Sequence, residues 1–277
     1  MITDKQKEYY QAQGFLIKNN VFSSDEINFI TDHCETICQK HKDRMIIEEN
    51  GDPYSIYLDQ KDKVLNTFIR LPRLLNSACL LLNSSVYVHQ IKLNHKKAMH
   101  GSEILWHEDY IFWKTLDKIL KPELLTVAIL LDDVYFYNSP LMFIPSSHKR
   151  QVTSTEIFKS EYPSDGVVNS WSDSQKSGLS TVVSNIRYQV DQESLLKLIG
   201  KNKIECFTGE KGSAIFFHAK TIHGSTKNIS PYDRRMLFIT YNCTTNVNIE
   251  NRNNRMDFIA YRDNSALTVK KSKNWMK

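Results

Sequence analysis

From Ser85 to about Tyr241 the chain consists mainly of short apolar runs separated by polar and turn-forming residues. Runs of this kind, rich in β-branched and aromatic residues, are typical of β-strands. We predict strands at residues 86–93, 104–113, 125–131, 141–144, 213–218 and 236–241. Many short strands that follow a helical part indicate a β-sandwich or jelly roll with helices packed outside it.

The residues before Ser85 have helical patterns instead. Two capping boxes, Thr3-x-x-Gln6 and Ser23-x-x-Glu26, predict helices near the N-terminus and over residues 27–40. A short strand-like run at residues 14–17 separates them, and a further helical region at 63–82 is interrupted by a proline. The overall prediction is a mainly β fold with peripheral N-terminal helices.

The length and composition fit one domain. The chain has 277 residues, of which 41% are hydrophobic and 24% charged, so it can bury one sizeable core. We predict a single domain over residues 1–277, with a helical part at about 1–84 and a jelly-roll core at about 85–250. Residues 152–185 are polar, rich in serine and without clear periodicity, which indicates a lid or a surface insertion.

The charge distribution argues against nucleic acid as a partner. The formal net charge is +5 and the isoelectric point about 8.8, but lysine and arginine are spread along the chain rather than clustered in a stripe. We find neither the apolar core of a signal peptide nor a long apolar run. We therefore expect a cytoplasmic location and no association with a membrane. The five cysteines match no metal-binding spacing and are expected to be reduced.

The strongest chemical signal is Trp106-His107-Glu108-Asp109-Tyr110, within a predicted strand. Residues two apart on a strand face the same side, so His107 and Asp109 could both point at one metal ion. The best distant partner is His223, which is followed by a glycine that permits close backbone approach. Two imidazoles and one carboxylate on one face of an octahedron form the site of non-haem iron(II) oxygenases.

The His-x-Asp pattern is weak by itself. His41-Lys42-Asp43 has the same spacing, at the charged end of a predicted helix, where side chains two apart diverge. His218 is a rival to His223 as the third ligand, although Ala219 and Lys220 follow it.

A downstream arginine strengthens the prediction. Arg234 lies eleven residues after His223, across a turn rich in asparagine, serine and proline, so a returning strand could bring it beside the metal site. Its guanidinium fork suits the distal carboxylate of 2-oxoglutarate, and Ser225 could donate to the same carboxylate. Arg235 would then point to the opposite face of the strand.

Taken together, these segments resemble the phytanoyl-CoA dioxygenase superfamily, and within it the bacterial branch that holds ectoine hydroxylase and free-proline 4-hydroxylase. The resemblance extends over about residues 5–265. The matching segments are Leu71-Pro72-Arg73-Leu74-Leu75, the run from Val86 to Asn94, the run from Trp106 to Trp113, Pro140-Leu141-Met142-Phe143-Ile144-Pro145, and His223-Gly224-Ser225 through Pro231 to Arg234.

The resemblance implies a double-stranded β-helix of the cupin type, with Fe2+, 2-oxoglutarate and O2 as cofactor and co-substrates. It implies iron ligation by His107, Asp109 and His223. It implies 2-oxoglutarate contacts from Asn94, Trp106, Ser225 and Arg234. Substrate contacts would come from Gln90, Trp113, Thr126 and Phe238. An amide, a hydroxyl and aromatic rings are suited to a small zwitterion.

The sequence departs from the branch at three kinds of position. Residues 114–118 replace a segment that usually carries an acidic pair and a glycine. Ser139 and Ser146 stand where flanking glycines are usual. Residues 52–60, where relatives often present an arginine toward the site, contain none. These changes leave the predicted iron ligands intact and concern the substrate.

We therefore predict an oxygenase that hydroxylates an unactivated carbon of a small free amino acid or similar metabolite, proline-like by preference, with release of succinate and CO2. Two alternatives stay open. One is desaturation, epoxidation or ring rearrangement by the same cofactors, and the other is a non-catalytic metal-binding jelly roll. The oligomeric state is left open.

Overall fold

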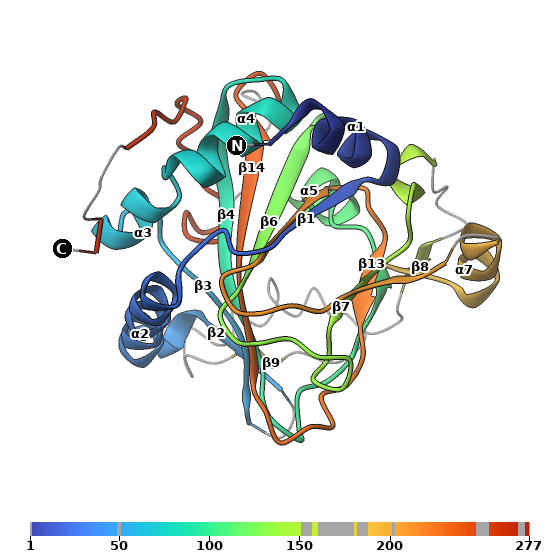
Figure 1. Cartoon of the computed structure of the whole chain (residues 1–277), viewed down its shortest axis with the longest axis horizontal. Coiled ribbons are helices and arrows are strands. Elements are labelled where there is room, and N and C mark those ends of the chain that lie inside the picture. Colours follow the sequence, from blue (N-terminus) through green and yellow to red (C-terminus); the bar gives the residue numbers. More distant parts are fainter. Residues whose placement is uncertain are drawn as a thin grey trace.

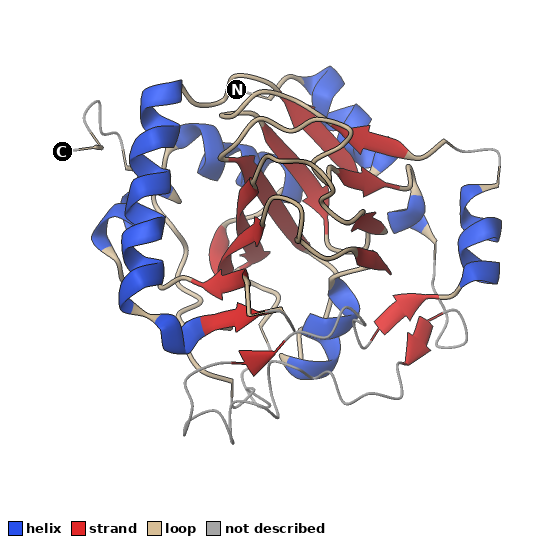
Figure 2. Cartoon of the chain, turned by 90° about the horizontal axis from the view of Figure 1, so that it is seen from below, coloured by secondary structure: helices blue, strands red, loops and turns tan. Residues whose placement is uncertain are grey.

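The computed structural model describes residues 2–48, 51–150, 157–159, 180–181, 188–200, 203–247, 255–270 and 275–276. Within them, two β-sheets face each other and helices cover the outside of the larger one (Figures 1 and 2). This is the jelly-roll arrangement that the succession of short strands predicts. No helix of the described part is both long and apolar enough to cross a bilayer.

The larger sheet has eight strands, and all its pairs are antiparallel except β2–β9. Their order is β1 (Phe15–Lys18), β12 (Ala214–His218), β6 (Leu124–Leu130), β14 (Arg234–Cys243), β4 (Val86–Lys96), β3 (Pro53–Tyr57), β2 (Met45–Ile47) and β9 (Ser180–Thr181). The long strands β4 and β14 lie side by side at its centre, and they position much of the candidate site.

The smaller sheet has the order β11 (Glu205–Phe207), β7 (Leu141–Phe143), β13 (His223–Ser225) and β5 (Ile104–His107). A separate pair joins β10 (Tyr188–Val190) and β8 (Ile157–Lys159). Strands β8 and β9 lie within the segment predicted as a lid, residues 152–185, and the rest of that segment lies outside the described residues.

The helices are α1 (Asp4–Gln13), α2 (Ser24–Lys40), α3 (Lys63–Phe68), α4 (Pro72–Leu82), α5 (Tyr110–Leu116) and α7 (Gln192–Ile199), with short 3-10 turns at Lys42–Arg44 and Ser147–Lys149. Both predicted capping boxes are present, because Thr3 and Ser23 each accept a hydrogen bond from the residue that caps them in return. The proline at 72 starts α4 rather than bending a longer helix, since a first-turn position needs no amide donor.

Alternation along the central strands divides the core into two layers. Ile91, Leu93, Leu237 and Ile239 pack with the helices in the main apolar cluster. The intervening positions of the larger sheet face the smaller one, where a second cluster joins Ala128, Phe217 and Met236 to residues such as Phe143. One face of the larger sheet thus packs against helices and the other against the smaller sheet, as the predicted jelly roll with external helices requires.

One predicted strand is wrong. The run at residues 104–113 is a strand only as far as His107, and from Tyr110 it forms helix α5. A short run of large apolar residues fits either structure, so periodicity alone does not separate them. Here Tyr110 and Trp113, one helical turn apart, pack together in a small apolar cluster.

Helix α5 ends in a backbone conformation that favours glycine. Lys118 has a φ of 57°, in the left-handed region, and the next amide, of Ile119, donates to the Trp113 carbonyl at 3.1 Å. At a helix end of this kind the left-handed residue is usually glycine. Ser139 and Ser146, which replace glycines usual in the family, also have positive φ, at 68° and 63°.

We expect Lys118→Gly to raise the free energy of unfolding by about 1 kcal/mol, because it removes the left-handed strain of an exposed side chain. Lys114→Gly is the matched control: it lies inside the same helix and should instead lower stability by about 1 kcal/mol. Urea denaturation of the two variants measures both effects. A lower free energy of unfolding for Lys118→Gly would show that the backbone of Lys118 is not strained in the folded protein.

Candidate functional site

The two histidines of the site lie on neighbouring strands of the smaller sheet. His107 ends β5 and His223 begins β13, and the two residues are direct cross-strand partners. Their rings are 4.3 Å apart between centroids. The close approach of the strands requires Gly224, because a Cβ there would lie 2.9 Å from the Ile104 carbonyl oxygen. The prediction that this glycine permits a close backbone approach is confirmed.

Each imidazole is oriented by a backbone carbonyl. The Nδ1 atom of His107 lies 2.8 Å from the Leu105 carbonyl oxygen, and that of His223 lies 2.9 Å from the Thr221 carbonyl oxygen. A carbonyl can only accept, so Nδ1 carries the proton in both rings and Nε2 keeps its lone pair free. This is the tautomer that binds a metal through Nε2.

Asp109 reaches the histidines by a turn, not by strand alternation. It follows the end of β5 and stands at the N-cap of α5, where its carbonyl accepts from the Phe112 amide at 3.1 Å. An aspartate at this position commonly caps the helix with its side chain, but this carboxylate makes no such bond. Its two oxygens lie 3.7 Å from Nε2 of His107 and 3.9 Å from Nε2 of His223.

The three groups form a compact set of potential ligands. One ligand atom from each of His107, Asp109 and His223 lies within 4.8 Å of the others. His41, the other His-x-Asp match, ends α2 instead. Among the described residues the set contains His223 and not its rival His218, whose Nδ1 accepts from the Lys220 amide at 3.0 Å.

The electrostatics favour a cation between these groups. Burial, followed by the neighbouring His107, lowers the pKa of His223 to about 4, so its imidazole is neutral at neutral pH. Burial alone would raise the pKa of Asp109, but the two imidazoles and Lys92 outweigh it and hold that pKa below its usual value. Two neutral imidazoles and an ionised carboxylate are the forms that ligate a divalent metal.

A second feature of the site is a pair of buried basic side chains. Arg234 begins β14 directly opposite Lys96 at the end of β4, and their exposed fractions are 0% and 1%. Like charges on directly opposed strand residues are destabilising, and unpaired buried charges are costly. Such an arrangement therefore favours an anionic ligand between the two strands and the smaller sheet.

The guanidinium of Arg234 has unused donors. Its Nε donates to the Ser139 carbonyl at 3.0 Å, whereas Nη1 and Nη2 are buried and have no hydrogen-bond partner in the described part of the chain. Burial lowers the pKa of Arg234 to about 10, so the group stays charged at neutral pH. A buried fork with two free donors is suited to a carboxylate.

Lys96 was not predicted from the sequence. Its Nζ donates to the Ser225 hydroxyl at 2.7 Å and to the carbonyls of Ser102 and Thr226 at 2.6 and 2.9 Å. Burial and then Arg234 hold its pKa well below the usual range. The available signal was the alternation Gln90, Lys92, Asn94, Lys96, which places four polar side chains on one face of a central strand.

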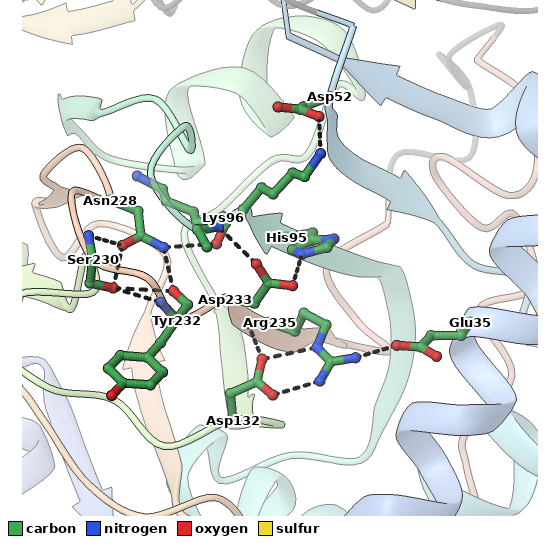
Figure 3. A network of polar contacts seen from close by, with 12 residues as sticks. Glu35, Asp52, His95, Lys96, Asp132, Asn228, Ser230, Tyr232, Asp233 and Arg235 are labelled. Atoms are coloured by element: carbon green, nitrogen blue, oxygen red, sulfur yellow. Dashed lines mark hydrogen bonds and ion pairs between the residues drawn. The ribbon is translucent and has the colours of Figure 1, made fainter.

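Arg235 points to the opposite face, as the alternation predicts. Its Nε and Nη2 donate to the two carboxylate oxygens of Asp132 at 2.9 and 2.6 Å, and it also pairs with Glu35 of α2 (Figure 3). The neighbouring Asp233 binds His95 at 3.0 Å in the same network. The two adjacent arginines thus have different environments. Arg235 forms ion pairs with carboxylates, whereas the guanidinium of Arg234 has no carboxylate partner among the described residues.

The remaining predicted residues are placed as follows. The Oδ1 atom of Asn94 is buried on the face of β4 that carries Lys96, and no described residue donates a hydrogen bond to it. Thr126 and Thr240 share a hydrogen bond of 3.0 Å, two residues along β14 from Phe238. The Gln90 amide donates to the Ile259 carbonyl at 2.7 Å, so one of its donors is already engaged.

Two predicted contacts lie within apolar packing. The ring of Trp106 is on the side of β5 opposite His107, against Ile144 and Ile222, so the structure does not bring this ring to the other site residues. Trp113 is buried in the cluster around α5, with its ring 5.6 Å from that of His89. Alternation along β5 explains the first placement and the helix explains the second.

Comparison with known proteins bears on this geometry. The sequence matches the phytanoyl-CoA dioxygenase (PhyH) family over residues 10–236. The chain belongs to this family. One relative is the ectoine dioxygenase of Bordetella bronchiseptica, which is 32% identical over 87% of this chain and 75% of the relative. Another is the L-proline trans-4-hydroxylase of Streptomyces griseoviridis, 30% identical over 87% of this chain and 86% of the relative.

Solved structures agree with the family assignment. The apo crystal structure of EctD from S. alaskensis superposes with a TM-score of 0.77 at 26% identity, over 97% of this chain and 87% of that one. Membership of the phytanoyl-CoA dioxygenase family confirms the predicted double-stranded β-helix and the predicted class of enzyme, a 2-oxoglutarate-dependent dioxygenase that uses Fe2+ and O2.

Glu108 stands between two of the site residues but faces away from them. Its carboxyl is buried, one oxygen has no partner in the described part of the chain, and burial raises its pKa to about 7 from an ordinary 4.5. A raised carboxyl pKa means that the ionised form is disfavoured in the folded state. The contribution of Glu108 to the free energy of unfolding is therefore fully present below the pKa that this carboxyl has in the unfolded chain. It is lost as the pH rises through about 7.

We expect Glu108→Gln to raise stability at alkaline pH, because the amide cannot ionise. The gain over the parent should be small near about pH 4 and should reach at most about 3 kcal/mol near about pH 8. Denaturant titrations of the metal-free proteins at both pH values measure it. An equal difference at the two pH values would contradict the burial of an ionisable carboxyl.

Proposed function

We propose that this protein hydroxylates an unactivated carbon of a small free amino acid or similar metabolite, proline-like by preference, with release of succinate and CO2. The observation that carries the proposal is the buried, unpaired guanidinium fork of Arg234 on the same interior as the His107, Asp109 and His223 set. An anion anchor and a metal-ligand set close together are what a chelating 2-oxo acid requires.

The residues fit the iron and the co-substrate. His107, Asp109 and His223 would hold Fe2+ through two free Nε2 lone pairs and a carboxylate that no cap engages. Arg234 would hold the distal carboxylate of 2-oxoglutarate, with Lys96 and Ser225 beside it. When bound, the metal and 2-oxoglutarate supply with O2 the oxidising power for the reaction, and the protein binds, orients and excludes water.

Ser225 illustrates the orienting role. Its hydroxyl oxygen accepts from Lys96 at 2.7 Å, so its own proton is directed elsewhere and is available to a carboxylate on Arg234. Asn94 lies between Lys96 and Lys92 on the same face, and it could bind the co-substrate through its amide. These assignments explain why so many polar groups are buried here.

The substrate assignment is supported by the chemistry of the predicted contacts and by the relatives. The predicted contacts Gln90, Thr126, Phe238 and Trp113 combine amide, hydroxyl and aromatic groups, and the two aromatic residues pack in apolar clusters. Two relatives carry the names ectoine dioxygenase and L-proline trans-4-hydroxylase. The five cysteines are free thiols, which suits the expected cytoplasmic location.

A panel of free amino acids, assayed with Fe2+ and O2 in the presence and absence of 2-oxoglutarate, tests the proposal. We expect substrate-dependent succinate and a product that has gained one oxygen atom, as detected by mass spectrometry. A product that has lost two hydrogens would assign desaturation instead. No succinate above the substrate-free level with any small molecule would contradict the proposal.

A further inference from the structure

The β2–β3 pair contains an irregularity at Tyr54. Met45 pairs with Ile56 and Ile46 with Ser55, but the next residue of β2, Ile47, pairs with Pro53. Tyr54 is therefore the extra residue of a β-bulge. A bulge breaks the strict alternation of side chains and can turn one of them toward a site.

The packing shows to which face Tyr54 is turned. Ser55 pairs with Asn94 and Tyr57 with Lys92, so both share the interior face of the larger sheet. Tyr54 packs with Ile46 and Tyr57, which lie on that face, and not with the helix-side cluster that contains Ile56. Regular alternation would have placed Tyr54 beside Ile56, so the bulge has moved its ring to the interior.

The phenol lies within the electrostatic field of the site. Its burial raises the pKa of Tyr54, and among the charged groups that act on it Arg234 has the largest effect, ahead of Glu48, Tyr57 and Asp109. Tyr54 in turn acts on Arg234. Both the guanidinium of Arg234 and the carboxylate of Asp109 therefore act on the Tyr54 phenol, and the guanidinium effect is the larger.

We propose that the Tyr54 hydroxyl donates a hydrogen bond to the distal carboxylate of bound 2-oxoglutarate, next to Arg234. The inference rests on the proposed function, which puts that carboxylate on Arg234. A phenol that stays protonated is a neutral donor, so it adds a bond to the anion without adding another buried charge beside Arg234.

Calorimetric titration of 2-oxoglutarate into the anaerobic iron(II) protein tests the inference. Loss of one hydrogen bond to a charged group reduces the free energy of binding, so Tyr54→Phe should weaken the affinity for 2-oxoglutarate about tenfold. Tyr135→Phe is the matched control, because this tyrosine is exposed and its hydroxyl donates to Asp133 on the surface. It should bind 2-oxoglutarate as the parent does.

A second ligand separates a lost contact from a damaged fold. 2-Oxovalerate has the same chelating end but no distal carboxylate, so its affinity should be equal in the parent and in Tyr54→Phe. An equal loss for both ligands would overturn the inference. So would an unchanged 2-oxoglutarate affinity in Tyr54→Phe while Arg234→Gln loses binding, a result that leaves the proposed function intact. If Arg234→Gln also binds normally, the proposed co-substrate site itself is wrong.

Discussion

An Asp109→Ala protein is expected to lose hydroxylation by more than about a hundredfold. Substitutions of groups that merely orient a metal ligand already cost 10–100-fold in affinity or activity, and Asp109 would be a ligand itself. Its carboxylate lies 3.7 and 3.9 Å from the two Nε2 atoms, and it is the one acid in the described metal-ligand set. Without it two imidazoles remain, and iron should be held weakly.

The neighbouring carboxyl provides the control for this prediction. Glu108 is one residue away and buried, but it is not part of the ligand set. Glu108→Gln should therefore keep iron binding and turnover near the parent level, as measured by succinate release and by metal content after desalting. An Asp109→Ala protein that turns over substrate as fast as the parent would contradict the proposed metal site.

Arg234→Gln is expected to weaken 2-oxoglutarate binding by about a hundredfold or more. The fork can form two charge-assisted hydrogen bonds to one carboxylate, and each such bond is worth roughly 1.5–3 kcal/mol. Arg234→Lys keeps the charge but not the fork, so it should recover only part of the loss. Titration of the anaerobic iron(II) proteins with 2-oxoglutarate gives the affinities.

Two further measurements make this prediction specific. Within the described residues both terminal nitrogens of Arg234 are buried without partners, so Arg234→Gln should not lower stability in the absence of 2-oxoglutarate. Added 2-oxoglutarate should stabilise only the parent. Arg235→Gln is the adjacent control. It breaks the pairs with Asp132 and Glu35 and should lower stability but leave co-substrate affinity unchanged. The reverse pattern would show that Arg235 faces the ligand.

The convergence of His107, Asp109 and His223 and the buried position of Arg234 could be predicted because short sequence patterns determine where these residues lie. A histidine followed by a glycine permits close strand contact at His223, and a turn and a returning strand bring Arg234 back. Asp109 was predicted for the wrong reason: strand alternation was assumed, but a helix begins at this residue. Spacing alone could not reveal this, because a helix and a strand can share one short apolar run.

Other features depend on partners distant in sequence. Lys96 is important because Arg234 lies directly opposite it, and that register is fixed only by the assembled sheet. Tyr54 reaches the interior through a bulge for which the sequence gives no clear signal. Similarly, Gln90 is engaged by the Ile259 carbonyl, from a segment 169 residues away. Single-sequence patterns carry local information and do not fix such long-range pairings.

The most direct test of the central claim is anaerobic addition of 2-oxoglutarate to the iron(II) protein, followed by its visible charge-transfer absorption. The account predicts a band that saturates at one iron and one 2-oxoglutarate per chain in the parent. The same band should be lost in Asp109→Ala and His223→Ala and should need far more 2-oxoglutarate in Arg234→Gln. A band of equal strength and affinity in all four proteins would contradict the convergence of these side chains on one ion.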